Sequence, residues 1–166
     1  MTAGQVASFD SQRKGFTRGG SGALLLNYDL KDNALNSSER STGFGMELKA
    51  GYCWNSHDVF AFDIFALQRK ADNSDNTFVY TGIDWNHHFS QSMRSFYSLL
   101  GVGVSMGTIY HDAYLGAGFK IGGGYQFTDN FQIGLTYLNI SGQSFLFKDH
   151  DAGVEVVYLT LSANLY

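Results

Sequence analysis

Proline is absent from this sequence of 166 residues, and cysteine, net charge and long apolar runs are all scarce. The single cysteine, Cys53, excludes an internal disulfide, and no cysteine–histidine spacing of the zinc-site type is present. The longest purely aliphatic run, residues 23–26, is far shorter than the roughly 20 apolar residues that a membrane-spanning helix needs, which excludes a helical membrane protein. The formal charge of −4 provides no basic surface for nucleic acid.

The abundant residues favour strands. The sequence contains 20 glycines, 14 phenylalanines and 10 tyrosines, which combines strand-forming residues with residues that interrupt helices. Apolar residues alternate with small or polar ones, at the period of two that indicates a half-buried strand, in eight segments: residues 16–29, 44–54, 60–69, 78–89, 96–110, 115–127, 131–141 and 154–166. We therefore expect an all-β fold with eight strands.

The connections between these segments differ in length. Short turns (residues 55–57, 90–95 and 128–130) alternate with mostly longer, polar connections (residues 31–42, 70–76 and 142–153), although residues 111–114 form a short one. This alternation is typical of up-and-down barrels that cross an outer membrane. Segments of about 10 to 14 residues also suffice for a tilted strand to cross a bilayer, which requires roughly 9–11.

The orientation of the two strand faces decides the kind of barrel. In a soluble, lipocalin-like barrel the apolar face surrounds a ligand, and such a barrel is the alternative prediction. Here the second face combines many glycines, which suit a crowded lumen, with polar residues: Glu47, Lys49, Asp63, Asp84, Lys120, Gln126, Gln132 and Thr136. We therefore expect the apolar face to contact lipid. Aromatic residues at the strand ends then form an interfacial girdle: Trp54, Phe89, Phe96, Phe127, Phe131 and Tyr166.

Residues 116–137, a strand, a tight turn and a second strand, resemble the small eight-stranded Gram-negative outer-membrane barrels of the OmpA and OmpX type, and the likeness extends over residues 15–166. The resemblance implies an eight-stranded antiparallel up-and-down transmembrane β-barrel in the bacterial outer membrane. It also implies a terminal aromatic residue recognised by the assembly machinery. Tyr166 occupies that place, but it shares its phase with Asn164 rather than Leu165, which a trimmed terminus or a local bulge would explain.

The leading functional hypothesis is a monomeric, non-enzymatic membrane scaffold with a closed polar interior and no large pore. It would display residues 31–42, 70–76 and 142–153 outside the cell, with outer-membrane lipids and lipopolysaccharide as partners. Residues 1–14 lack periodicity and are expected to form a flexible periplasmic lead. No metal site or cofactor is predicted, since the adjacent His87 and His88 fall on opposite strand faces.

The lumen of an eight-stranded barrel is too narrow for a water channel, so its inward polar residues must satisfy one another. Symmetric connections would place Lys49 opposite Asp63 and Asp63 opposite Asp84. Two carboxylates would then share one lysine, and Lys120 and Arg69 are the candidates for a second cation. A buried charge network that plugs the barrel is the main interpretation, and a proton or ion path is the alternative.

Three polar residues, Asn139, Ser141 and Glu155, fall on the lipid-facing phase of the last two strands. A final loop centred near residue 148 would place Ser141 opposite Glu155. One interpretation is that both strands have already left the hydrocarbon at this level, where polar residues cost little.

A second interpretation comes from a resemblance of these strands to the lipid A 3-O-deacylases, outer-membrane barrels with an esterase site on their outer wall. The resemblance implies that Ser141 is a nucleophile and Glu155 an orienting residue. Asn139 occupies the base position and Gly142 the oxyanion position. Because an amide cannot accept the serine proton, the cluster as written should be inactive or very slow.

Overall fold

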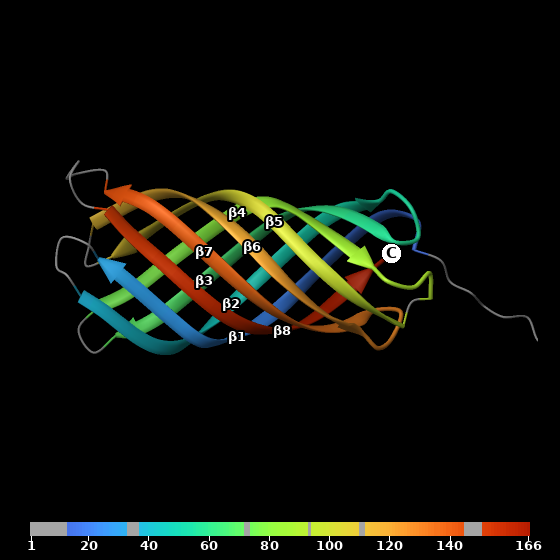
Figure 1. Cartoon of the computed structure of the whole chain (residues 1–166), viewed down its shortest axis with the longest axis horizontal. Helices are drawn as coiled ribbons and strands as arrows, with labels where there is room; N and C mark the ends of the chain where they lie inside the picture. Colours follow the sequence, from blue (N-terminus) through green and yellow to red (C-terminus); the bar gives the residue numbers. More distant parts are fainter. Residues whose placement is uncertain (1–12, 33–36, 72–73, 93, 110–111, 145–150) are drawn as a thin grey trace, which may run out of the picture.

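The computed structural model describes residues 13–32, 37–71, 74–92, 94–109, 112–144 and 151–166. These residues form a closed barrel of eight strands in which sequence neighbours pair antiparallel (Figure 1). The strands are β1 (Gly15–Asp32), β2 (Ser37–Cys53), β3 (Asp58–Ala71), β4 (Ser74–His88), β5 (Ser95–Ile109), β6 (Asp112–Gln126), β7 (Phe131–Ser144) and β8 (Asp151–Leu165). Pairing of β8 with β1 closes the sheet, so the predicted all-β, up-and-down barrel is confirmed. The described residues include no helix long and apolar enough to cross a membrane.

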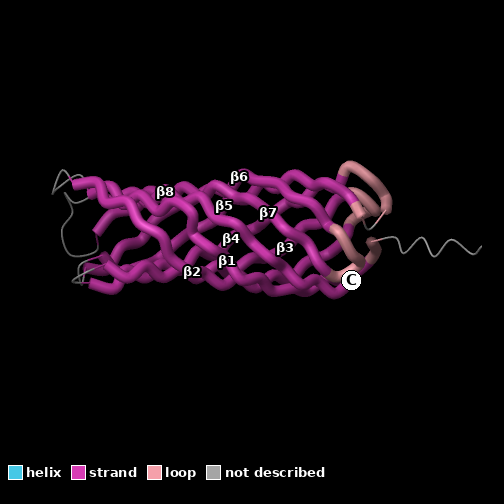
Figure 2. The backbone as a smooth tube through the Cα atoms, turned by 90° about the horizontal axis from the view of Figure 1, so that it is seen from below, coloured by secondary structure: helices cyan, strands magenta, loops and turns pink. Residues whose placement is uncertain are grey.

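The two ends of the barrel differ. The connections at residues 54–57, 89–94 and 127–130 gather at one end, here called the turn end, together with the start of β1 and the C-terminus (Figure 2). At the opposite end, here called the loop end, β1, β3, β5 and β7 end and β2, β4, β6 and β8 begin. The residues between these strands, 33–36, 72–73, 110–111 and 145–150, are outside the described residues.

The strands extend further toward the loop end than the sequence predicted. Much of the expected connections at residues 31–42, 70–76 and 142–153 is strand, with pairs such as Lys31 with Ser38 and Arg69 with Asn76. Most of the residues in these segments are of polar types, so the alternation of apolar residues in the sequence stops although the strand pairing continues. Hydrophobic periodicity therefore marked the end of the apolar belt rather than the end of each strand.

The apolar strand faces point outward. Phe62, Val102 and Phe119 are 51 %, 66 % and 47 % exposed, whereas Asp63 is fully buried and the Lys49 side chain is 15 % exposed. This pattern is the reverse of a lipocalin-like barrel, where apolar residues fill the inside. It confirms the predicted orientation of the two faces.

Strand β1 contains a bulge, which explains its weak alternation in the sequence. Leu25 pairs with Tyr158 of β8 and Asn27 with Val157, so Leu26 is an extra residue. The bulge moves the inward phase by one position, and both Leu25 and Tyr28 are buried as a result.

The interior is packed in three layers. The layer nearest the loop end is apolar: its buried residues include Leu25, Tyr28, Leu30, Phe65, Leu67, Phe78, Tyr80, Leu138, Ile140, Val154, Val156 and Tyr158. The middle layer consists of charged residues, and the layer at the turn end is built around Arg13. The apolar layer is a correction to the expected polar interior, since the small and polar face also carries large residues in its loop-end half.

Glycine allows the strands to approach closely around this packed lumen. A Cβ atom at Gly124 would collide with the carbonyl oxygen of Ile133 on β7, while at the outward Gly22 no heavy atom lies within 4 Å of the Cβ position. The high glycine content thus serves crowded positions as well as open ones.

Candidate functional sites

Five charged side chains from four strands meet in the middle layer. Lys120 of β6 binds Glu47 of β2 at 3.0 Å, binds Asp63 of β3, and lies 3.8 Å from Asp84 of β4. Lys49 of β2 lies 3.0 Å from Asp84 and 3.4 Å from Glu47. Three carboxylates thus share two ammonium groups, and the cluster connects β2, β3, β4 and β6 across the lumen.

The sequence predicted this cluster in part. Lys49 pairs with Asp63 as expected, but Asp63 pairs with Gly82, and Asp84 pairs with Ala61. The β3–β4 connection is centred one residue earlier than the symmetric estimate, and this shifts the pairing by two positions.

Lys120 is the second cation of the cluster, and it is one of the two residues that the sequence offered for this role. Arg69 is not part of the cluster, because its guanidinium lies over the Tyr28 ring at 5.5 Å in the apolar layer. Glu47 is a third carboxylate that the pairing argument missed. Its position two residues before Lys49 on the same strand face was the available signal.

The surroundings of the cluster hold it rigidly. Lys120 Nζ lies 4.6 Å from the centre of the Tyr80 ring and 5.2 Å from that of Phe65, and Ser21 donates a 2.8 Å hydrogen bond to Glu47. A Cβ atom at Gly101 would collide with Asp84, so this glycine provides room for the carboxylate. Oxygen atoms of the three carboxylates come within 4.8 Å of one another, but the two ammonium groups already neutralise most of the charge a metal ion would need. The chemistry is that of a buried ion-pair network.

Arg13 closes the interior at the turn end. Its guanidinium is fully buried and donates to the side chains of Gln126 and Ser95 and to backbone carbonyl oxygens of Ser56, Ser90 and Ser92, at 2.9–3.3 Å. Residues 1–12 of the expected flexible lead lie outside the described residues, but Arg13 is fixed inside the barrel. Because no periodicity surrounds Arg13 in the sequence, no pattern could have indicated this role.

Tyr166 contributes to the same layer. Its hydroxyl group donates to Gln126 Oε1 at 3.4 Å, the same oxygen that accepts two hydrogen bonds from Arg13. The side chain therefore points toward the end of the lumen, in agreement with its phase in the sequence and unlike the other aromatic residues of the expected girdle.

The polar residues on the outer wall lie together, but in a different register from that predicted. Asn139 pairs with Glu155, and Ser141 pairs with Gly153. The three side chains face outward and line a groove of about 630 Å³ together with Gln143. Asn139 therefore lies between the other two, and its amide donates to the Tyr137 hydroxyl at 3.3 Å. Gly142 also lines this groove, but it falls on the inward phase of β7, so a side chain at that position would point away from that of Ser141.

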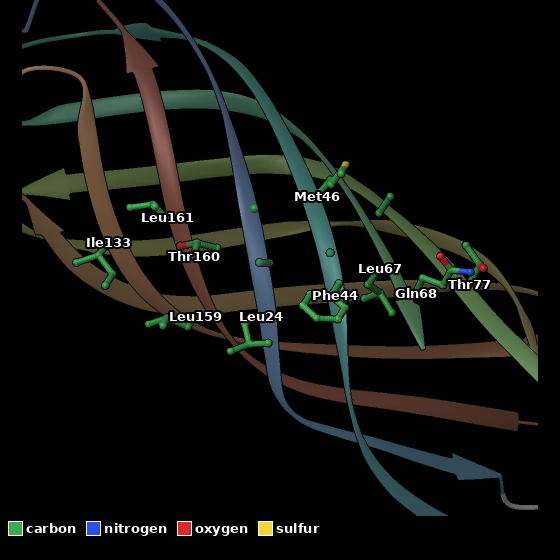
Figure 3. Close-up of a pocket in the computed structure, with 14 residues that line it drawn as sticks. Leu24, Phe44, Met46, Leu67, Gln68, Thr77, Ile133, Leu159, Thr160 and Leu161 are labelled. Carbon is green, nitrogen blue, oxygen red and sulfur yellow. The ribbon is translucent and has the colours of Figure 1, made fainter. Parts of the chain in front are cut away.

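A second groove on the outer wall is apolar. Its volume is about 840 Å³, and it crosses β1, β2 and β8 where Gly22 contributes no side chain. Leu24, Phe44, Met46 and Leu161 project around it (Figure 3). Gln68 and Thr77 add polar groups at its loop-end side, so its shape and polarity suit a hydrocarbon chain.

Apolar side chains on the outside, charged side chains inside and a closed sheet of eight strands define a β-barrel of the small outer-membrane type. The chain is similar in structure to neisserial surface protein A, with 19 % identity, a TM-score of 0.61 and coverage of 91 % of this chain and 96 % of that one. It is also similar to Ail, the attachment invasion locus protein of Yersinia pestis (15 % identity, TM-score 0.60, coverage 92 % and 99 %). The N-terminal β-barrel domain of Pseudomonas aeruginosa OprF gives 15 % identity, a TM-score of 0.54 and coverage of 93 % and 100 %.

No protein-family model matches the sequence, and no curated protein matches it significantly. The protein therefore has the fold of eight-stranded bacterial outer-membrane barrels. At these identities the similarity concerns the fold, and function has to be argued from the chain's own residues.

Proposed function

We propose that this protein is an integral outer-membrane β-barrel that acts as a monomeric, non-enzymatic scaffold and displays the loop end, with residues 31–42, 70–76 and 142–153, at the cell surface. Its partners are outer-membrane lipids and lipopolysaccharide. The observation that supports the proposal most strongly is the inverted polarity: Val102 is 66 % exposed on the outer wall while Asp63 is fully buried within.

The size of the exposed apolar surface supports a lipid environment. Large apolar residues on all eight strands are exposed, whereas soluble monomers rarely expose apolar patches larger than a few hundred Å². In hydrocarbon the same side chains cost nothing, and the closed barrel leaves no strand edge among the described residues without a hydrogen-bonding partner. The apolar groove at Gly22 provides room for a lipid chain within this surface.

The packed layers support a closed interior. Tyr158, Phe65 and Leu138 fill the loop-end half, the ion pairs of Lys120 fill the middle, and Arg13 fills the turn end. A water-filled path for ions would need a continuous gap through all three layers, so we expect no conductance.

Three measurements test the proposal. The refolded protein should migrate differently on a detergent gel before and after boiling, and lipids brominated on their acyl chains should quench its tryptophan fluorescence. Liposomes that contain it should not leak small ions. A protein that stays monomeric in water without detergent would support a soluble ligand-binding barrel instead, and rapid leakage would contradict the closed interior.

A second candidate function, ester hydrolysis of lipid A, is favoured by the position of Asn139 between Ser141 and Glu155. A histidine at that position would contact both a nucleophile and a carboxylate, as base-assisted ester hydrolysis requires. We expect no activity from the protein as it is and a gain of activity from Asn139→His. The assay is the mass of lipid A after incubation, with Asn139→His/Ser141→Ala as the matched control. Loss of a hydroxyacyl chain with the unmodified protein would contradict the non-enzymatic scaffold.

A further inference from the structure

An aromatic pocket with a carboxylate lies at the turn end, on the outer wall. Trp54, Asn55, Asp58, Phe60 and Trp85 line a space of about 510 Å³. The rings of Phe60 and Trp85 stack with a centroid distance of 6.5 Å and an interplanar angle of 16°, and Trp54 is 76 % exposed. The pocket thus presents aromatic surface around an acidic group.

The carboxylate of Asp58 is fixed by several neighbours. Trp85 Nε1 donates to Oδ1 at 2.9 Å, Asn55 Nδ2 donates to Oδ2 at 2.8 Å, and His87 Nδ1 lies 2.9 Å from Oδ1. The Asn55 side-chain oxygen in turn accepts hydrogen bonds from the backbone N–H groups of His57 and Asp58, both at 2.7 Å. The pocket is therefore built by the turn between β2 and β3 together with the first residues of β3 and the last of β4, and hydrogen bonds within the protein orient its carboxylate.

The hydrogen bonds from the Trp85 indole and the Asn55 amide orient the carboxylate without neutralising it. Asp58 is the first residue of β3, and the hydrogen bonds that its carboxylate accepts from Trp85 and Asn55 favour the ionised form. The imidazole of His57 also lies nearby, and its ring stacks on that of His87 at a centroid distance of 5.9 Å. A fixed anion beside three aromatic rings is the arrangement that attracts an organic cation.

We propose that this pocket binds the primary ammonium headgroup of a phospholipid in the leaflet at the turn end. The inference rests on the proposed membrane placement. A lipid is favoured over a free amine because Phe60 and Trp85 also belong to the lipid-facing side of β3 and β4, so acyl chains can continue along the wall from the same pocket. A primary ammonium is favoured over a quaternary one because its N–H groups can donate to Asp58.

The natural fluorophores make the test direct, because the sequence contains two tryptophans and both line the pocket. Short-chain phospholipids with ethanolamine, choline or glycerol headgroups are titrated into the refolded protein in non-ionic detergent. We expect a saturable fluorescence change with the ethanolamine lipid, weaker binding with choline and no saturable change with glycerol. Free ethanolamine should not reproduce the signal.

Two variants localise the site. Asp58→Asn removes the charge with little change of shape and should weaken ethanolamine-lipid binding by at least about tenfold. The matched control, Asp129→Asn, makes the same change in another turn at the same end and should bind normally. Phe60→Leu removes an aromatic ring but keeps an apolar side chain, and should weaken binding of both the ethanolamine and the choline lipid. Unchanged gel mobility before boiling shows that each variant has folded.

Equal affinity for all three headgroups, unchanged binding by Asp58→Asn, or a full response to free ethanolamine would overturn this inference. Failure of the membrane placement gives a different result, because quenching by brominated acyl chains is then absent whatever the headgroup. If brominated acyl chains quench the tryptophan fluorescence but all headgroups bind equally well, the proposed ammonium site is wrong and the proposed membrane placement still stands.

Discussion

Replacement of Lys120 by methionine tests the ion cluster most directly. Methionine keeps much of the length and the apolar stem of lysine but removes the ammonium group. In this variant, Lys49 would be the one ammonium group left in the cluster for the three carboxylates of Glu47, Asp63 and Asp84. The fully buried Asp63 would lose the lysine that neutralises it. We therefore expect a large loss of stability with an unchanged fold.

The magnitude follows from the burial of the cluster. Breaking a buried ion pair by removing one partner costs about 3–5 kcal/mol, because an uncompensated charge remains in a poorly solvated place. This corresponds to a fall in the folding equilibrium constant of roughly a hundred- to a few-thousand-fold. The loss should be smaller in Lys120→Met/Asp63→Asn, since the second change removes one of the two excess negative charges that the first leaves.

The assay is urea unfolding of the protein in lipid vesicles, followed by the difference in gel mobility between folded and unfolded forms. Lys14→Met serves as the control, because Lys14 is an exposed lysine just before β1. If Lys120→Met unfolds within about 1 kcal/mol of the unmodified protein, or if the Asp63→Asn change makes it worse, the cluster does not hold uncompensated charge and the reasoning is refuted.

Three further substitutions test other parts of the structure. Arg13→Ala should lower stability by about 2 kcal/mol or more, measured by urea unfolding, because Gln126 and Ser95 lose a charged donor. Gly124→Ala should cost about 1–3 kcal/mol whereas Gly22→Ala should change stability little, since a methyl group collides with backbone at the first position and meets open space at the second. Val102→Arg on the outer wall should cost about 2–4 kcal/mol in vesicles, and an equal cost in aqueous solution without lipid would contradict a lipid-facing surface.

The sequence predicted the barrel because two-residue alternation distinguishes the strand face that points outward from the face that lines the interior. The alternation, together with the glycines and charges of the second face, assigns the apolar residues outward and Lys49 and Asp63 inward. The structure agrees, since Phe62, Val102 and Phe119 are exposed and Asp63 is buried. The pattern is local to each strand and strong along most of them, so the number of strands and their facing directions could be predicted well.

Register across the longer connections could not be predicted in the same way. Sequence pattern fixes the face of a residue, but pairing also depends on where a connection is centred, and a shift of one residue at the centre moves every pair by two. The short β2–β3 turn was centred correctly, and Lys49 pairs with Asp63. The β3–β4 and β7–β8 connections were not, so Asp84 and Glu155 acquired other partners than expected.

Contacts made across the lumen were the least predictable. Glu47 and Lys120 lie 73 positions apart in the sequence, and Arg13 reaches Gln126 across 113. No alternation signal carries information on which inward residues face each other through the barrel. The sequence shows which charged residues point inward. Which of them contact each other becomes known only from the structure of the closed barrel.

The pairing of β1 with β8 has a consequence for the timing of folding. This seam joins Arg18 to Leu165, residues from opposite ends of the described chain, and its formation completes the cylinder. Contacts between such distant residues are slow to form because a long stretch of chain must first lose its freedom. Until they form, β1 and β8 each have unpaired backbone groups along one edge, so two incomplete copies can pair with each other before either barrel closes.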